Sequence, residues 1–214
     1  MSQVTPTEAW KILQEGNDRF VAGVSEHPSQ GIEDRERLTH GQNPHVVLFG
    51  CSDSRLSAEI IFDQGLGDMF VVRTAGQVLD SAVIGSLEFA AAVLEVPLIA
   101  ILGHDSCGAI KATLSALDEL EIPGGYIREL VEKVSPSILA GRSEGLSRVD
   151  EFEARHVVET GRQLVERSRI IGERVDDGRL AIVGLTYQLG EGRAHVRSVL
   201  GEIEGIDSDD VVRH

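Results

Sequence analysis

The sequence has little positive charge. It contains 20 Lys and Arg residues against 35 Asp and Glu residues, which gives a formal net charge of −15 at pH 7. Nucleic acids and anionic membrane surfaces bind proteins through basic patches, so this balance argues against both kinds of partner. What the acidic surface does indicate is solubility, and it carries no information about the fold.

Long apolar runs, export signals and cysteines are also scarce. No run approaches the roughly 20 apolar residues that a transmembrane helix needs. The first residues, MSQVTPTEAWKILQEG, show no basic segment followed by an apolar one, so we expect no secretory signal and a cytoplasmic protein. The 214 residues include two cysteines and are 42% hydrophobic. This content is enough for one globular core that needs no disulfide.

The apolar segments that are present alternate with helical patterns. Continuous apolar strands separated by helices are typical of a mostly parallel sheet covered on both faces. We therefore expect an α/β fold with about four such strands, an antiparallel edge strand, helices on both faces and an N-terminal helical arm. The expected strands cover residues 45–50, 69–73, 96–103 and 179–187, with the edge strand at 194–199 after a turn at 188–192.

The helices are predicted from their caps and periodicity. Thr5, Pro6 and Glu8 form a good helix start, and residues 23–44 are polar and predict a loop. Further helices are expected at 78–94, 108–120 and 126–140, followed by one long helix that begins near Ser147 and includes Ile171. We expect residues 1–214 to form a single domain, with residues 1–42 as an N-terminal arm that packs on a dimer partner.

Both cysteines follow predicted strands. Cys51 comes directly after one strand, while His104 and Cys107 follow another. Ligands gather beyond the carboxyl ends of parallel strands, so these side chains are expected around one point. Two thiolates and an imidazole suit Zn²⁺, and three protein ligands with an open fourth position are typical of catalytic zinc. The fourth position falls to water or to Asp53.

Simpler interpretations exist for each residue alone. A lone cysteine after a strand is usually a small buried hydrophobic residue, and a lone histidine is usually a hydrogen-bonded side chain. The shared location of Cys51, His104 and Cys107 favours the metal site. A Cys51–Cys107 disulfide is an alternative, but it leaves His104, Asp53 and Arg55 without a role.

Asp53 and Arg55 stand two residues apart beside the first cysteine. They can form a bidentate ion pair, in which Arg55 holds Asp53 off the metal. Asp53 would then accept a hydrogen bond from zinc-bound hydroxide, or take the fourth metal position when Arg55 releases it. The alternative is a surface ion pair that contributes little to stability.

These motifs resemble a known family. Cys51-x-Asp53-x-Arg55 after an apolar strand, followed by Gly103-His104-x-x-Cys107-Gly108, is similar to the β-class carbonic anhydrases. The resemblance is specific from about residue 41 to residue 117. It implies one Zn²⁺ per chain, bound by the three residues above and, in a closed form, by Asp53. It also implies a catalytic Asp53–Arg55 dyad and a homodimer or dimer-based tetramer.

The resemblance further implies a narrow apolar substrate pocket. Its walls are expected to include Phe70, Ala75 and Phe89, with the Gly108 backbone at the rim. Gln42 matches a glutamine that plant-like members bring to the pocket across the dimer interface.

The function implied is reversible hydration of CO2 to bicarbonate and a proton through zinc-bound hydroxide. Two alternatives stay open at this point. One is a CS2 or COS hydrolase on the same scaffold, because both substrates are linear and apolar like CO2. The other is a zinc- or redox-sensing regulatory protein, which would have no need of the Arg55 cation beside an open metal position.

Overall fold

A six-stranded sheet forms the centre of the molecule. The computed structural model describes residues 4–206 and 211–213. The strand order is β2-β1-β3-β4-β5-β6, and all neighbours are parallel except β4 and β5. The predicted mostly parallel sheet is confirmed. The strands are β1 (Val46–Cys51), β2 (Met69–Thr74), β3 (Leu98–His104), β4 (Ala181–Gln188), β5 (Arg193–Leu200) and β6 (Val212–Arg213).

The strand β5 is antiparallel to β4, as expected, and a turn at residues 188–192 joins them. Its expected edge position needs a correction, because β6 pairs along its outer side. β6 is only two residues long, too short to produce the alternation that predicts a strand.

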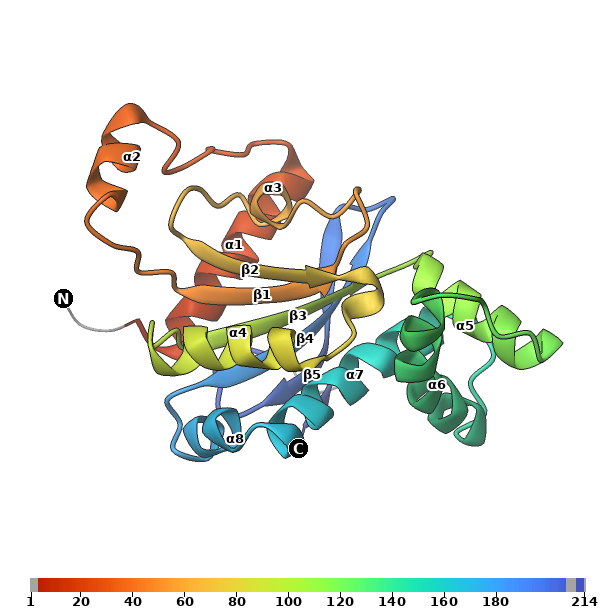
Figure 1. The fold of residues 1–214 in the computed structure, drawn as a ribbon. Helices are drawn as coiled ribbons and strands as arrows, with labels where there is room; N and C mark the ends of the chain where they lie inside the picture. The colour runs from red at the N-terminus through yellow and green to blue at the C-terminus, as the bar shows by residue number, and fades with distance from the viewer. Residues whose placement is uncertain (1–3, 207–210, 214) are drawn as a thin grey trace.

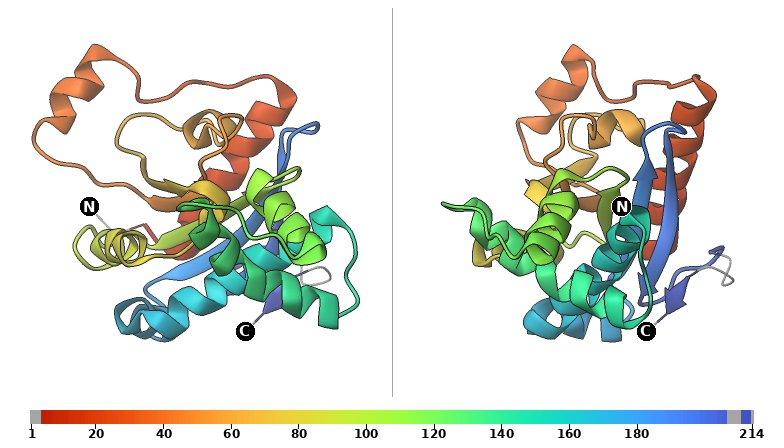
Figure 2. Two further views of the ribbon diagram at one scale, coloured as in Figure 1. Left: turned by 45° about the vertical axis from the view of Figure 1, so that its right-hand side comes forward. Right: turned by 90° about the vertical axis from the view of Figure 1, so that its right-hand side faces the viewer.

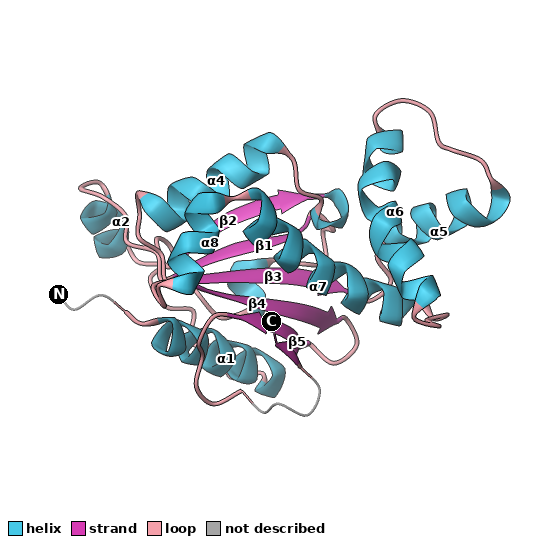
Figure 3. Ribbon diagram, turned by 90° about the horizontal axis from the view of Figure 1, so that it is seen from below, coloured by secondary structure: helices cyan, strands magenta, loops and turns pink. Residues whose placement is uncertain are grey.

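Helices cover both faces of the sheet (Figures 1 and 3). Every residue of β1 and β3 is buried, which explains their continuous apolar sequences. One core cluster joins α1 and α3 to one face, and a second joins α4, α7 and α8 to the other. The helices are α1 (Pro6–Ala22), α2 (Ile32–Leu38), α3 (Ala58–Ile61), α4 (Ser81–Ala92), α5 (Gly108–Glu119), α6 (Ile127–Ser143), α7 (Val149–Arg167) and α8 (Arg169–Asp176), with a 3₁₀ turn, η1, at Ala75–Gln77.

Two expectations about helices were wrong. The predicted loop at 23–44 contains α2, a short charged helix without an apolar face that periodicity could detect. The predicted long helix is divided at Ser168. Ser168 has extended backbone angles, its hydroxyl caps α8 by accepting from Ile171 N–H, and the same hydroxyl donates to Glu88. The periodicity continues across this break because both helices pack on the same core.

The first helix packs on the chain's own sheet. Thr5 and Glu8 form the predicted capping box, and Trp10 and Leu13 are buried in the cluster on that face. Packing of residues 1–42 on a partner chain stays a prediction. Within the described residues, no helix is long and apolar enough to cross a membrane.

The helices α5 and α6 lie beyond the carboxyl ends of the strands (Figures 1 and 2). A third core cluster holds them against the start of α7, and it contains Cys51, Cys107, Ile110, Val134 and Phe152. The two cysteines therefore lie where the sheet meets this helical layer.

Candidate metal centre

Two adjacent strands bring three potential metal ligands to one point. Cys51 is the last residue of β1 and His104 the last residue of β3, and these strands are parallel neighbours. Cys107 caps the start of α5. One potential ligand atom from each residue lies within 4.8 Å of the other two, and all three residues are buried. The part of the chain that the structure describes holds one such group able to bind a metal ion.

The imidazole of His104 is oriented for metal binding. Its Nδ1 lies 2.8 Å from the carbonyl oxygen of Asp105. A carbonyl only accepts hydrogen bonds, so Nδ1 carries the proton and Nε2 presents a lone pair. That Nε2 atom is buried and has no hydrogen-bond partner. Since buried polar atoms are nearly always paired, an unpartnered nitrogen facing two thiols fits a metal ligand.

Both thiols are free, which contradicts the alternative of a disulfide. Gly76 N–H donates to the Sγ atom of Cys51 at 3.3 Å. The neighbouring Cys107 lowers the pKa of the Cys51 thiol, and although burial opposes this shift, His104 and Gly76 add to it. The site therefore stabilises a thiolate, the form of cysteine that binds metal ions.

Asp53 and Arg55 form the expected bidentate pair at the rim of the site. Arg55 Nε donates to Asp53 Oδ1 at 2.8 Å, and Arg55 Nη2 donates to Asp53 Oδ2 at 2.6 Å. These hydrogen bonds hold the pKa of Asp53 below its usual range. Asp53 Oδ2 also lies 3.9 Å from Nε2 of His104. The carboxylate is thus ionised, turned toward Arg55 and adjacent to the metal-binding group.

Arg73, at the end of β2, fixes the backbone that carries the dyad. Its Nε donates to the carbonyl oxygen of Cys51 at 2.9 Å, and its Nη2 donates to that of Asp53 at 2.5 Å. Sequence reasoning assigned Arg73 no role in this site. Its place at the carboxyl end of a strand next to β1 was the available signal.

Helix α7 supplies two further buried polar side chains that sequence reasoning missed. Glu153 accepts a hydrogen bond from Cys107 N–H at 2.8 Å, and burial raises the pKa of its carboxyl to about 7. His156, one turn later, contacts the carbonyl oxygen of Gly76 at 2.9 Å. The available signal was a Glu and a His three residues apart on the apolar face of a predicted helix.

Comparison with known proteins agrees with this geometry. The sequence profile of a family described as carbonic anhydrase matches residues 46–194. The chain is 61% identical to carbonic anhydrase 2 of Mycobacterium tuberculosis (strain ATCC 25618 / H37Rv) and 63% identical to a carbonic anhydrase of Mycolicibacterium smegmatis. Each match covers 95% of this chain and 98% of the relative. The chain belongs to the carbonic anhydrase family.

Solved structures of β-carbonic anhydrases have a similar fold. The β-carbonic anhydrase CcaA matches with a TM-score of 0.70 and 26% identity, over 88% of this chain and 87% of that one. A structure of tetrameric β-carbonic anhydrases from Sordaria macrospora also matches with a TM-score of 0.70, at 24% identity, over 87% and 95% of the two chains. The predicted resemblance to the β-class and the prediction of an enzyme are both confirmed.

For a carbonic anhydrase, the expected substrate-pocket residues divide into two groups. Ala75 begins η1, next to Gly76 at the Cys51 thiol, and Gly108 directly follows Cys107. Phe70 instead pairs in register with Val47, four residues before Cys51, or about 13 Å along the strand. Phe89 lies on α4 beside Phe70, with 6.3 Å between the ring centroids. The structure therefore brings Ala75 and Gly108 to the metal centre, while Phe70 and Phe89 lie toward the other end of the strands.

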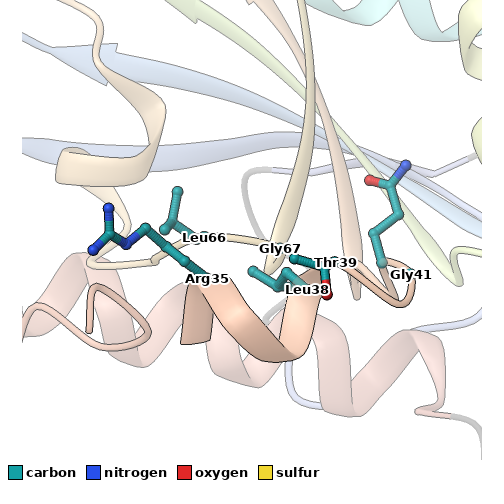
Figure 4. A pocket seen from close by; sticks show the side chains of 7 residues that line it. Arg35, Leu38, Thr39, Gly41, Leu66 and Gly67 are labelled. Atoms are coloured by element: carbon teal, nitrogen blue, oxygen red, sulfur yellow. The ribbon is translucent and has the colours of Figure 1, made fainter. Parts of the chain in front are cut away.

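Gln42 also lies away from the metal centre of its own chain. It precedes β1 and is exposed, and it lines a hollow of about 660 Å³ beside the loop that leads into β2. Figure 4 shows Arg35, Leu38 and Leu66 around this hollow. A carbonic anhydrase pocket that uses Gln42 therefore needs this residue from a second chain.

Proposed function

We propose that this chain catalyses the reversible hydration of CO2 to bicarbonate and a proton, with one Zn²⁺ held by Cys51, His104 and Cys107. The observation that carries the proposal is the buried, unpartnered Nε2 of His104 facing two free thiols. Two soft sulfur ligands and one borderline nitrogen favour zinc over the hard cations Mg²⁺ and Ca²⁺. Membership of the carbonic anhydrase family supports the reaction.

The bound zinc would act as a Lewis acid that lowers the pKa of a water molecule in its open fourth position. Asp53 is placed to orient that water by accepting a hydrogen bond from it. Arg55 fixes Asp53 for this role through two hydrogen bonds, and its cation offsets the charge of the two thiolates. In a closed form, Asp53 would leave Arg55 and serve as the fourth ligand.

We further propose a homodimer, or a tetramer built from dimers, in which the pocket is shared. Among the described residues, β2 pairs on one side only, with β1, and its residues are half-buried or exposed. Antiparallel pairing of two β2 strands about Val71 and Val72 would bring Phe70 of one chain beside Arg73 of the other. The metal centre of one chain would then receive Phe70, Phe89 and Gln42 from its partner.

We also retain two broader proposals from the sequence. The first is that residues 1–214 form a single catalytic domain. Two of the core clusters pack on the faces of the one sheet, and the third contains Cys51 at the end of β1. The second is a cytoplasmic location, which the two free thiols support, because free thiols are kept reduced in that compartment.

The test combines zinc analysis with stopped-flow CO2 hydration between about pH 6.5 and 9, for wild type and Asp53→Asn. We expect one zinc per chain in both proteins and a loss of at least about 100-fold in kcat for the variant, because it loses an oriented acceptor. The control is Asp118→Asn, which removes an exposed carboxylate that also pairs with an arginine, Arg142. A folded wild-type protein that stays inactive after zinc addition would contradict the proposal, and hydrolysis of COS or CS2 in its place would favour that alternative.

A further inference from the structure

A buried histidine outside the ligand set connects two helices to the metal centre. His156 on α7 is 4% exposed and lies between α6 and η1. Its Nε2 is 2.9 Å from the carbonyl oxygen of Gly76, and its Nδ1 is 2.8 Å from the hydroxyl oxygen of Ser137. Nothing in the proposed reaction uses His156 directly.

The direction of these hydrogen bonds follows from chemistry. The carbonyl of Gly76 can only accept, so Nε2 of His156 carries the proton and donates. Nδ1 then has a lone pair and accepts from the hydroxyl of Ser137. Burial lowers the pKa of His156, which favours the neutral ring with one proton on Nε2. One tautomer therefore satisfies both partners.

Gly76 is held from two further directions. Its N–H donates to the Sγ of Cys51 at 3.3 Å, and its backbone adopts a left-handed conformation with φ of +68°. A Cβ at this position would lie 2.6 Å from the Cβ of Ala109, on the helix that follows Cys107. The Gly76 backbone is thus fixed between the Cys51 thiol, the start of α5 and the ring of His156.

We propose that His156 is a positioning residue for the metal centre, which acts by holding the Gly76 N–H against the Sγ of Cys51. This inference rests on the proposed role of Cys51 as a metal ligand. A hydrogen bond from the Gly76 N–H fixes the orientation of the Cys51 sulfur, and contacts that orient a metal ligand in this way raise the affinity of the site for its metal ion. Ser137 donates its hydroxyl proton to Nδ1 of His156, and this hydrogen bond keeps the ring in the tautomer that the contact with Gly76 needs.

Three substitutions test the contact. His156→Leu removes the donor to Gly76, His156→Gln supplies an amide N–H in its place, and Ser137→Ala removes only the hydroxyl that fixes the tautomer. The matched control is Thr160→Val, one turn along α7. Thr160 is also buried, and its hydroxyl donates to the backbone carbonyl of His156 within the same helix.

The readouts are zinc affinity, by competition with a chelator, and the sulfur-to-metal charge-transfer band of the Co²⁺-loaded protein. We expect His156→Leu to lower zinc affinity by about 10- to 100-fold and to shift the band. His156→Gln and Thr160→Val should stay within about threefold of wild type with an unshifted band. Affinity and band in His156→Leu equal to those of Thr160→Val would overturn the inference.

Ser137→Ala keeps the test decisive if His156→Leu does not fold. We expect a loss of affinity of about threefold to tenfold in this variant, and an unchanged affinity and band in the folded protein would overturn the inference. Failure of this inference can be told apart from failure of the proposed function, because neither zinc affinity nor the Co²⁺ band depends on turnover. A wild-type protein that binds zinc without hydrating CO2 would remove the proposed reaction and leave this test intact.

Discussion

The metal centre and the segment of residues 23–43 are built in opposite ways. At the metal centre, the buried side chains of Cys51, His104 and Cys107 lie together, and two side chains of α7 hydrogen-bond to backbone groups beside them. Asp53 and Arg73 are held by several hydrogen bonds within the chain. In segment 23–43, no residue is buried. It is attached to the rest of the chain mainly at residues 62–68, where Asp63 accepts from the N–H groups of Glu26 and His27.

This difference separates what one chain completes by itself from what it does not. The ligand set and the dyad are assembled within a single chain, so their geometry follows from the fold. Gln42, in the segment with no buried residues, has its expected role only if another chain lies beside it. The effects of substitutions in the two regions should therefore differ in size, and also in whether they fall on stability or on activity.

The largest difference is expected between two glycines with nearly the same backbone angle. Gly76 at the metal centre and Gly23 at the end of α1 have φ of +68° and +69°, but an added Cβ meets Ala109 at 2.6 Å in the first case and nothing within 4 Å in the second. Gly76→Ala should lower the free energy of unfolding by about 3 kcal/mol, from strain and overlap together. Gly23→Ala should lower it by about 1 kcal/mol, from strain alone. Urea unfolding of both variants measures this, and equal losses would contradict the comparison.

Acid stability should separate a buried carboxylate from an exposed one. Although burial opposes it, hydrogen bonds from Arg162, Gln163 and Arg155 hold the pKa of Glu159 on α7 at about 2. Because this pKa lies below the ordinary value of 4.5, the carboxylate stabilises the fold above about pH 4.5. That contribution is lost as the pH falls toward 2. Glu159→Gln should cost about 1–2 kcal/mol at pH 6 and progressively less toward pH 3.

The matched variant in segment 23–43 is Asp34→Asn. Asp34 pairs with Arg37 on the exposed surface of α2, where solvent screens the interaction. Hydrogen bonds from Arg37 and Gly31 also lower the pKa of Asp34, but because of this screening Asp34→Asn should change the unfolding free energy much less than Glu159→Gln does at pH 6. Unfolding curves for wild type and both variants at pH 6, 4.5 and 3 measure the difference. A loss of unfolding free energy in Glu159→Gln that stays constant with pH would contradict the stabilising role of the Glu159 carboxylate.

The smallest expected effect is that of Gln42→Ala, and it falls on activity alone. If a partner chain brings Gln42 to the pocket, kcat/KM for CO2 should fall by about fivefold to tenfold, or about 1 kcal/mol. Zinc content and unfolding free energy should not change, because Gln42 is exposed in its own chain. Gln30→Ala, another exposed glutamine in the segment, is the control. Unchanged kcat/KM in a protein shown to be dimeric by sedimentation would remove Gln42 from the pocket.

The sequence was most informative where chemistry and strand ends coincide. Cys51, His104 and Cys107 could be predicted because two buried strands end at them, and the Asp53–Arg55 pair could be predicted because both residues follow the same strand. Glu153 and His156 could not be assigned, since their partners are the backbone groups of Cys107 and Gly76, 46 and 80 residues away. Such contacts depend on how α7 crosses the sheet. The helix α2 was missed for another reason: it has no buried residues, and periodicity detects only helices with an apolar face.

We propose that two cysteines and one histidine bind a single zinc, with water or Asp53 in the fourth position. X-ray absorption at the zinc edge of the purified wild-type protein tests this most directly, because it counts the ligand atoms. We expect two sulfur atoms at about 2.3 Å and two nitrogen or oxygen atoms at about 2.0–2.1 Å from each zinc. Zinc bound without sulfur, or by a single sulfur, would contradict it.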